Sequence, residues 1–154
     1  MLQNIKVPYF KQENWYTCGP ACLRMVLAYI GIIKTENEVT EACNTTELGT
    51  TPIQIAETFQ KFGVIASSVK NANIDDLRHE IKEGRPVIVL IDPSHMYGGI
   101  SGFGHFIVIV GFEDEKIICH DPDEPNGEYI KYELEAFIKA WNATRCWMIK
   151  LEKE

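Results

Sequence analysis

Two apolar, β-branched runs in the second half of the chain constrain its fold most strongly. The first run covers residues 104–112 and the second covers residues 116–121, with the acidic turn 113–115 between them. Such runs predict two buried strands that pair as an antiparallel hairpin. If the loop has an odd number of residues, His105 lies directly opposite Asp121, with Cβ atoms roughly 5 Å apart. An even loop without a bulge places the two residues on opposite faces.

The rest of the chain divides into a helical first half and a second half rich in strands. Residues 18–29 carry the apolar stripe of an amphipathic helix that Gly31 ends, and Thr35 and Thr51 have the spacing of helix caps. This order favours an α+β fold in a single domain that covers residues 1–154. The remaining elements are expected as a strand at 7–10, helices at 35–43 and 51–62, a strand at 64–69, a helix at 74–83, strands at 86–91 and 128–132, a helix at 134–141 and a strand at 146–151.

A cysteine opens the first helix, six residues after a glutamine. The start of a helix presents unpaired N–H groups and the positive end of the helix dipole, and both stabilise a thiolate. The amide of Gln12 can donate a hydrogen bond to the oxyanion that forms when a Cys18 thiolate attacks a carbonyl. His105 is then the candidate base, and Asp121 the acid that orients its ring. A core cysteine, a core histidine, a turn-forming aspartate and a surface glutamine are the alternatives.

Together, Gln12, residues 18–23, residues 104–108 and the pair Asp121–Pro122 resemble the C39-type peptidases, a branch of the papain-like cysteine peptidases. The resemblance covers nearly the whole chain. It implies a papain-like fold in which a helical lobe carrying the cysteine packs against an antiparallel sheet carrying the histidine and the aspartate, with the active site in the cleft between them. By the same resemblance, Cys18 is the nucleophile, His105 the base, Asp121 the orienting acid and Gln12 the oxyanion donor.

The resemblance also implies an activity and a class of substrate. The best-known family members are N-terminal domains of peptide-exporting ABC transporters, and they cut leader peptides after a double glycine. No membrane or ATPase segment follows in this sequence, so we expect a free-standing domain whose substrate is a peptide or a protein and whose partner transporter is unknown. We therefore expect a cysteine peptidase, with leader-peptide processing as a candidate role. A papain-like acyltransferase and a non-catalytic peptide-binding domain are the alternatives, and no cofactor is expected.

The amino-acid composition argues against some classes of binding partner and favours one cellular compartment. The net charge of −7 argues against nucleic acid and against anionic membranes as partners. No apolar run approaches the roughly 20 residues that cross a bilayer, and the first residues lack the features of a signal peptide. Five cysteines, an odd number, favour reduced thiols and hence a cytoplasmic protein. The cysteines other than Cys18 are expected to be structural, namely Cys22, Cys43, Cys119 and Cys146.

Other residues near the candidate site have weaker signals. Trp15 and Tyr16 either line the cleft beside Cys18 or anchor its loop, and Gly104 is a further candidate for substrate contact. The glycine-rich run 98–104 lacks a complete G-x-G-x-x-G and leads into a strand, which argues against nucleotide binding and favours a mobile rim loop beside the cleft.

The sequence predicts no metal site, and it predicts no catalytic role for the remaining histidines. Neither the spacing from Cys18 to Cys22 nor the adjacent pair Cys119–His120 is that of a zinc site, so no metal is expected. We expect His120 to point away from Asp121 with a structural role. His95 and His79 are expected to be an exposed loop residue and a helix surface residue.

Overall fold

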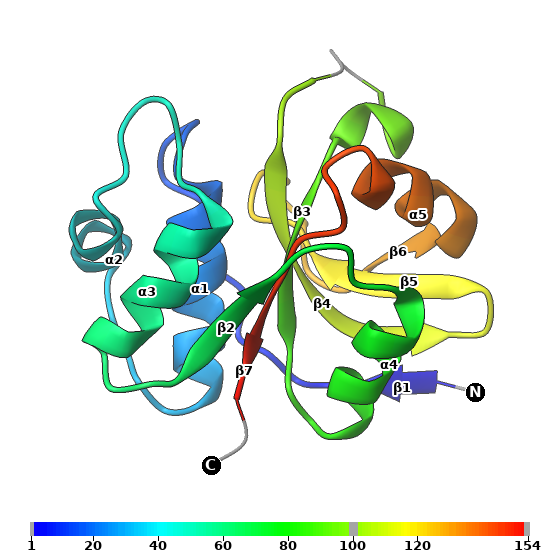
Figure 1. Ribbon diagram of the computed structural model, residues 1–154, viewed down its shortest axis with the longest axis horizontal. Helices are drawn as coiled ribbons and strands as arrows, with labels where there is room; N and C mark the ends of the chain where they lie inside the picture. The colour runs from blue at the N-terminus through cyan, green and yellow to red at the C-terminus, as the bar shows by residue number, and fades with distance from the viewer. Residues whose placement is uncertain (1, 99–101, 153–154) are drawn as a thin grey trace.

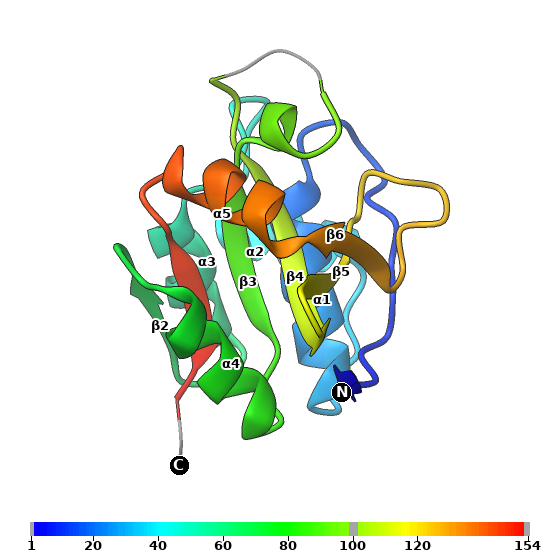
Figure 2. The ribbon, with the colours of Figure 1, turned by 90° about the vertical axis from the view of Figure 1, so that its right-hand side faces the viewer.

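The computed structural model describes residues 2–98 and 102–152, and in these residues one antiparallel sheet carries helices on both faces (Figures 1 and 2). The described strands form a seven-stranded sheet in the order β2-β7-β3-β4-β5-β6, and β1 pairs with the last residues of β4. Their bounds are β1 Leu2–Asn4, β2 Ala66–Val69, β3 Val87–Ile91, β4 His105–Glu113, β5 Lys116–His120, β6 Ile130–Glu133 and β7 Met148–Leu151. The α+β architecture expected from the sequence, with helices packed against an antiparallel sheet, is confirmed.

Helices α1, α2 and α3 lie on one side of the sheet, and α4 and α5 cover the other side (Figures 1 and 2). Because both faces are covered, β3 and β4 are buried along almost their whole length, which explains their continuous apolar sequences. The helices are α1 Cys18–Tyr29, α2 Glu36–Cys43, α3 Pro52–Lys61, α4 Ile74–Lys82 and α5 Leu134–Asn142, and a short 3₁₀ helix covers Pro93–His95.

The hairpin of β4 and β5 differs from the simplest expectation, and the difference moves the candidate site residues. The turn has two residues, an even number, but a β-bulge at Val110 adds one residue to β4 and restores the shared face. The carbonyl of Val110 accepts a 2.7 Å hydrogen bond from the N–H of Ile5, so the extra residue is anchored by the N-terminal segment. One step beyond the Val108–His120 pair, Asp121 comes opposite Ile107. His105 is therefore diagonal to Asp121, and the directly opposite register expected for an odd loop is not formed.

Two further expectations need correction. Residues 7–10 form no strand, and β1 lies earlier in the chain. Pro8 has no N–H to donate to a ladder, and the segment instead offers the carbonyl of Val7 to the ring of His120 at 2.7 Å. The strand expected at 128–132 is shifted to 130–133, and the other elements agree to within three residues at either end.

Candidate active site

Cys18 is the first residue of α1, at a helix start that no described side chain caps. The three helices α2, α3 and α4 all have complete capping boxes. The third residue of α1 is Pro20, which has no N–H to donate to a capping side chain. Thr17, the residue just before the helix, does not cap it, and its hydroxyl donates to the carbonyl of Asn14 at 2.9 Å. The first N–H groups of α1 therefore face outward without a cap, and they favour negative charge on the Cys18 sulfur.

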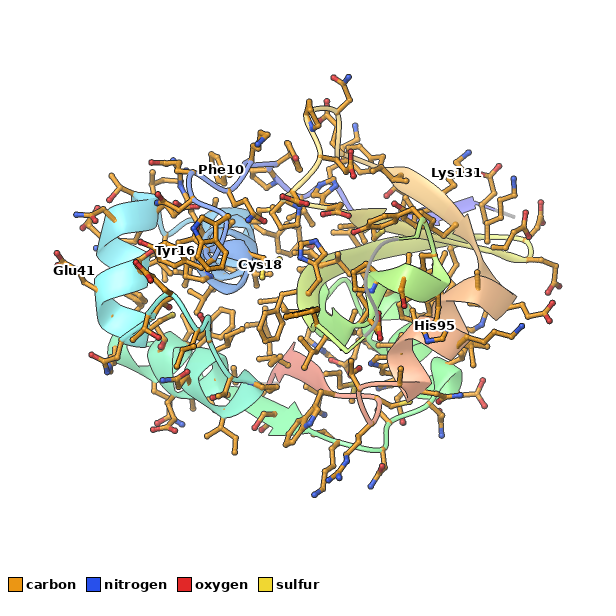
Figure 3. The ribbon with its side chains drawn as sticks, turned by 90° about the horizontal axis from the view of Figure 1, so that it is seen from above. Phe10, Tyr16, Cys18, Glu41, His95 and Lys131 are labelled. Carbon is orange, nitrogen blue, oxygen red and sulfur yellow. The ribbon has the colours of Figure 1, made fainter. Side chains whose placement is uncertain are left out.

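His105 connects Cys18 to Asp121. Its Nε2 donates a 2.7 Å hydrogen bond to Oδ1 of Asp121, and Cys18 lies close enough to the ring to raise the pKa of His105. Since Asp121 occupies Nε2, Nδ1 is the nitrogen left for the thiol. Figure 3, which looks along α1 from its N-terminal end, places Cys18 on the side of the helix turned toward the sheet. The structure thus brings together three of the residues that the sequence singled out, from α1, from the start of β4 and from the end of β5.

The environment favours the charged forms of both the imidazole and the carboxylate. Burial alone would lower the pKa of His105, but its hydrogen bond to Asp121 and its interaction with Cys18 outweigh burial and raise the pKa to about 10. Burial alone would raise the pKa of Asp121, but hydrogen bonds from His105, from the N–H of Asp123 and from Tyr97 hold that pKa below its ordinary value. The arrangement can hold an imidazolium beside the Asp121 carboxylate at neutral pH.

Gln12 lies in the loop before α1 and is only 7% exposed. Its N–H donates to the carbonyl of Pro122 at 2.8 Å, which ties the loop to the turn that follows Asp121. Its Nε2 donates to the carbonyl of Asn14 at 2.8 Å, the same oxygen that the Thr17 hydroxyl approaches. The side chain is thus fixed to the turn before Cys18, and its amide has a second N–H to offer. Its Oε1 is buried with no hydrogen-bond partner among the described residues.

The turn after β5 is held by residues that the sequence did not single out. The Tyr97 hydroxyl donates to Oδ2 of Asp121 at 3.0 Å, and the Tyr9 hydroxyl lies 2.8 Å from the Asp121 carbonyl. Gly127 closes the turn, since its carbonyl accepts a 2.7 Å bond from the N–H of Asp121. Tyr9 and Tyr97 belong to a loop before α1 and to the loop after β3. Their distance in sequence from Asp121 explains why no local pattern identified them.

The weaker candidates take different positions. Trp15 is 75% exposed and packs edge-on against Tyr16, whose label in Figure 3 lies over the start of α1. Gly104 is exposed, and a Cβ there would lie 2.8 Å from a methyl group of Leu90. His95 is exposed and lies well apart from Cys18, beside α5 (Figure 3). These positions leave Trp15, Tyr16 and Gly104 as candidates for substrate contact.

The other cysteines and histidines are placed as the sequence predicted. The four remaining cysteines are buried and free, whereas Cys18 is partly exposed. His120 is fully buried, with one ring nitrogen facing the Val7 carbonyl and the other accepting from the N–H of Tyr129. His79 lies on the exposed side of α4. Of the glycine-rich run, residues 99–101 lie outside the described residues, so the expected mobility of the rim loop remains a prediction.

Comparisons with known proteins identify a family. The family described as "Peptidase_C39 like family" matches residues 4–149. A C39-like peptidase structure from Bacillus anthracis matches with a TM-score of 0.82 and 17% identity, over 100% of this chain and 98% of that one. The peptidase domain of Streptococcus ComA, a bifunctional ABC transporter involved in quorum sensing, matches with a TM-score of 0.76 and 26% identity, over 97% and 98% of the two chains.

A third similar structure contains a peptide. It is a double glycine motif protease from an AMS/PCAT transporter in complex with the leader peptide, with a TM-score of 0.74 and 22% identity over 97% of this chain and 94% of that one. In residues 2–98 and 102–152 of the present chain, no helix has the length and apolar content that spanning a membrane requires.

Proposed function

The chain belongs to the Peptidase_C39 like family, and on this premise we propose that it is a cysteine peptidase that hydrolyses peptide amide bonds with Cys18 as the nucleophile. One observation carries the proposal. Asp121 is hydrogen-bonded to His105, and Cys18, at the uncapped start of α1, lies close enough to His105 to raise the pKa of its ring. A buried structural cysteine would have no need of a charged imidazole and a helix N-terminus together.

The proposed reaction follows from these contacts. His105 takes the proton of Cys18, and the thiolate forms a bond to the carbonyl carbon of the substrate amide. Gln12 and the N–H of Cys18 donate hydrogen bonds to the resulting oxyanion. The imidazolium gives its proton to the leaving amine as the C–N bond breaks, which leaves an acyl-enzyme. Water, with its proton taken by His105, then releases the acid and restores the thiol.

Asp121 acts through His105 in this scheme. Its carboxylate accepts the Nε2 proton, which directs Nδ1 to Cys18 and stabilises the imidazolium. The pKa of Asp121 is held below its ordinary value, so the carboxylate keeps its charge at neutral pH. We assign Asp121 the role of the orienting acid, which stays ionised and does not accept the proton during the reaction.

The substrate is proposed to be a peptide with small residues at the cut site. The similar PCAT protease acts at a double glycine motif and has been captured with a leader peptide. Leader-peptide processing is therefore the first role to test in this chain, by analogy of fold.

The test is cleavage of synthetic peptides that carry a Gly-Gly pair, beside the same peptides with the pair replaced, with products read by mass spectrometry. We expect cleavage after the pair in the wild type, loss of cleavage in Cys18→Ala, and unchanged cleavage in Cys146→Ala as the matched control. Equal cleavage by the wild type and Cys18→Ala would overturn the proposal. Binding of the peptides without cleavage would favour the non-catalytic peptide-binding domain.

A further inference from the structure

The Asp121 carboxylate has a partner that the proposed reaction does not use. Oδ1 accepts from His105 and from the N–H of Asp123, whereas Oδ2 accepts from the Tyr97 hydroxyl at 3.0 Å. From this geometry we propose that Tyr97 is a positioning residue, which fixes the Asp121 carboxylate in the orientation that holds the His105 ring toward Cys18. The inference rests on the proposed function, because it concerns the same three residues.

Burial makes the Tyr97 bond consequential. The Asp121 side chain is 1% exposed, so in the folded protein the Tyr97 hydroxyl, and not bulk water, is the donor to Oδ2. An ionised carboxylate that loses one of its donors in a buried place either moves to find another donor or becomes easier to protonate. Both responses weaken the hold of Asp121 on the His105 ring.

The loop that carries Tyr97 is pinned at its base. The buried Asp92, next after β3, accepts at Oδ1 from the N–H and the hydroxyl of Ser94, at 3.1 and 2.7 Å. Its Oδ2 accepts from the N–H of Gly102 at 2.9 Å, so one carboxylate joins the two ends of the loop. His105 follows three residues after Gly102. Tyr97 in this loop and His105 at the start of β4, just after it, therefore contact different oxygens of the Asp121 carboxylate.

The ring of Tyr97 is supported by a second tyrosine. Its centroid lies 6.0 Å from that of Tyr132 on β6, with the two rings tilted by 33°. The Tyr132 hydroxyl makes no hydrogen bond with a described residue, so Tyr132→Phe removes a neighbouring hydroxyl without removing a bond to Asp121. Tyr132 therefore provides a matched control for Tyr97.

Several ionisable groups act on Asp121, and each of these variants leaves all of them in place except the tyrosine that it replaces. Those that bond to it or lie close enough to interact electrostatically come from α1, β4, β5, β6 and the loops before α1 and after β3. They are Tyr9, Cys22, Tyr97, His105, Cys119 and Tyr132. In the turn after β5, Asp123 bonds to Asp121 through its backbone N–H, and the carboxylates of Asp123 and Glu124 act on the neighbouring tyrosines. Cys18 interacts with the same centre through His105. A shift specific to Tyr97→Phe thus reports the loss of one hydroxyl against a constant background.

The experiment is the rate of Cys18 alkylation by iodoacetamide from pH 4 to 9, read by peptide mass spectrometry in the full chain. A hydrogen bond to a charged group is worth about one pKa unit. We therefore expect the pH of half-maximal Cys18 labelling to rise by about one unit in Tyr97→Phe and to stay unchanged in Tyr132→Phe. The buried Cys22 and Cys119 should remain unlabelled, which reports that each variant is folded.

A double-mutant cycle separates positioning from a general structural role. If Tyr97 acts through the Asp121 carboxylate, Tyr97→Phe should cause no further shift in an Asp121→Asn background. An equal shift in both backgrounds, or an unmoved profile in Tyr97→Phe, would overturn the inference. A wild type whose Cys18 labels only as an ordinary thiol does, with a midpoint near the free value of about 8.5, would instead count against the proposed function. The two failures are therefore distinguishable.

Discussion

Gly127 offers the sharpest test of how the turn after β5 is built, through the substitution Gly127→Ala. A Cβ at this position would lie 1.9 Å from the carbonyl oxygen of Asp121 and 2.6 Å from the hydroxyl oxygen of Tyr9. Both distances are far short of the roughly 3.5 Å of an ordinary contact. The nearest atom belongs to the backbone, so a rotamer change cannot relieve the clash, and the turn itself has to move.

The expected loss of unfolding free energy follows from the hydrogen bonds that this movement of the turn breaks. The N–H of Asp121 bonds to the Gly127 carbonyl at 2.7 Å, and the Tyr9 hydroxyl lies 2.8 and 2.6 Å from the carbonyls of Asp121 and Glu124. Overpacking costs about 1–3 kcal/mol, and each lost hydrogen bond adds about 0.5–1.5 kcal/mol. With the Asp121 bond and the one that the Tyr9 hydroxyl donates both lost, we expect Gly127→Ala to lower the free energy of unfolding by about 2–6 kcal/mol.

Urea unfolding measures this loss, and Gly31→Ala is the control. Gly31 has a φ of +90° after α1, and a Cβ there would meet nothing within 4 Å. Its replacement costs only the left-handed backbone conformation, about 1–2 kcal/mol. Cys18 labelling below pH 8 should be lost in Gly127→Ala, because Asp121 is displaced, and kept in Gly31→Ala. A Gly127→Ala protein with the stability of Gly31→Ala and normal labelling would refute this reasoning.

Three further outcomes are expected. Gln12→Ala should lower the turnover of a cleavable peptide about 100-fold with little change in KM, since the oxyanion loses a donor; an unchanged kcat would remove Gln12 from the site. The folded pKa of His105 is raised to about 10 from an unfolded value of about 6.5, so its stabilisation is complete below pH 6.5 and lost as pH rises toward 10. The urea midpoint of the wild type should therefore fall across that window relative to His105→Gln, and parallel curves would contradict the assignment. Glu36→Ala should lower the unfolding free energy by about 1–3 kcal/mol, because both carboxylate oxygens accept from the N–H of Glu13, at 2.9 and 3.1 Å; thermal unfolding at pH 7 would measure it.

Features determined by neighbouring residues were predictable from the sequence. Thr35 with Glu38, and Thr51 with Gln54, form the capping boxes that their spacing indicates. The start of α1 at Cys18 follows in the same way, and so does the alignment of two apolar runs into a hairpin. Each of these depends on a few consecutive residues, whose physical preferences can be assessed without knowing the fold.

Features determined by distant segments were not predictable. The carbonyl of the bulged Val110 accepts a hydrogen bond from Ile5, which lies more than a hundred residues away in the chain. The contact of Tyr97 with Asp121 depends on how the loop after β3 is pinned by Asp92. The sequence therefore predicted Cys18, His105 and Asp121 as a group, but it predicted neither their diagonal register nor the tyrosines that support them.

Because of the single extra residue at Val110, His105 and Asp121 stay on one face of the sheet only if the hairpin changes length by an even number of residues. Successive side chains of a strand alternate between faces, so deleting one residue from β4 beyond His105 would turn the imidazole and the carboxylate to opposite sides of the sheet. Two residues could be added to or removed from the two-residue turn with far less consequence, because the alternation would be preserved. Among natural or engineered length variants of this hairpin, insertions and deletions should therefore survive in pairs, or singly only with a second bulge that compensates.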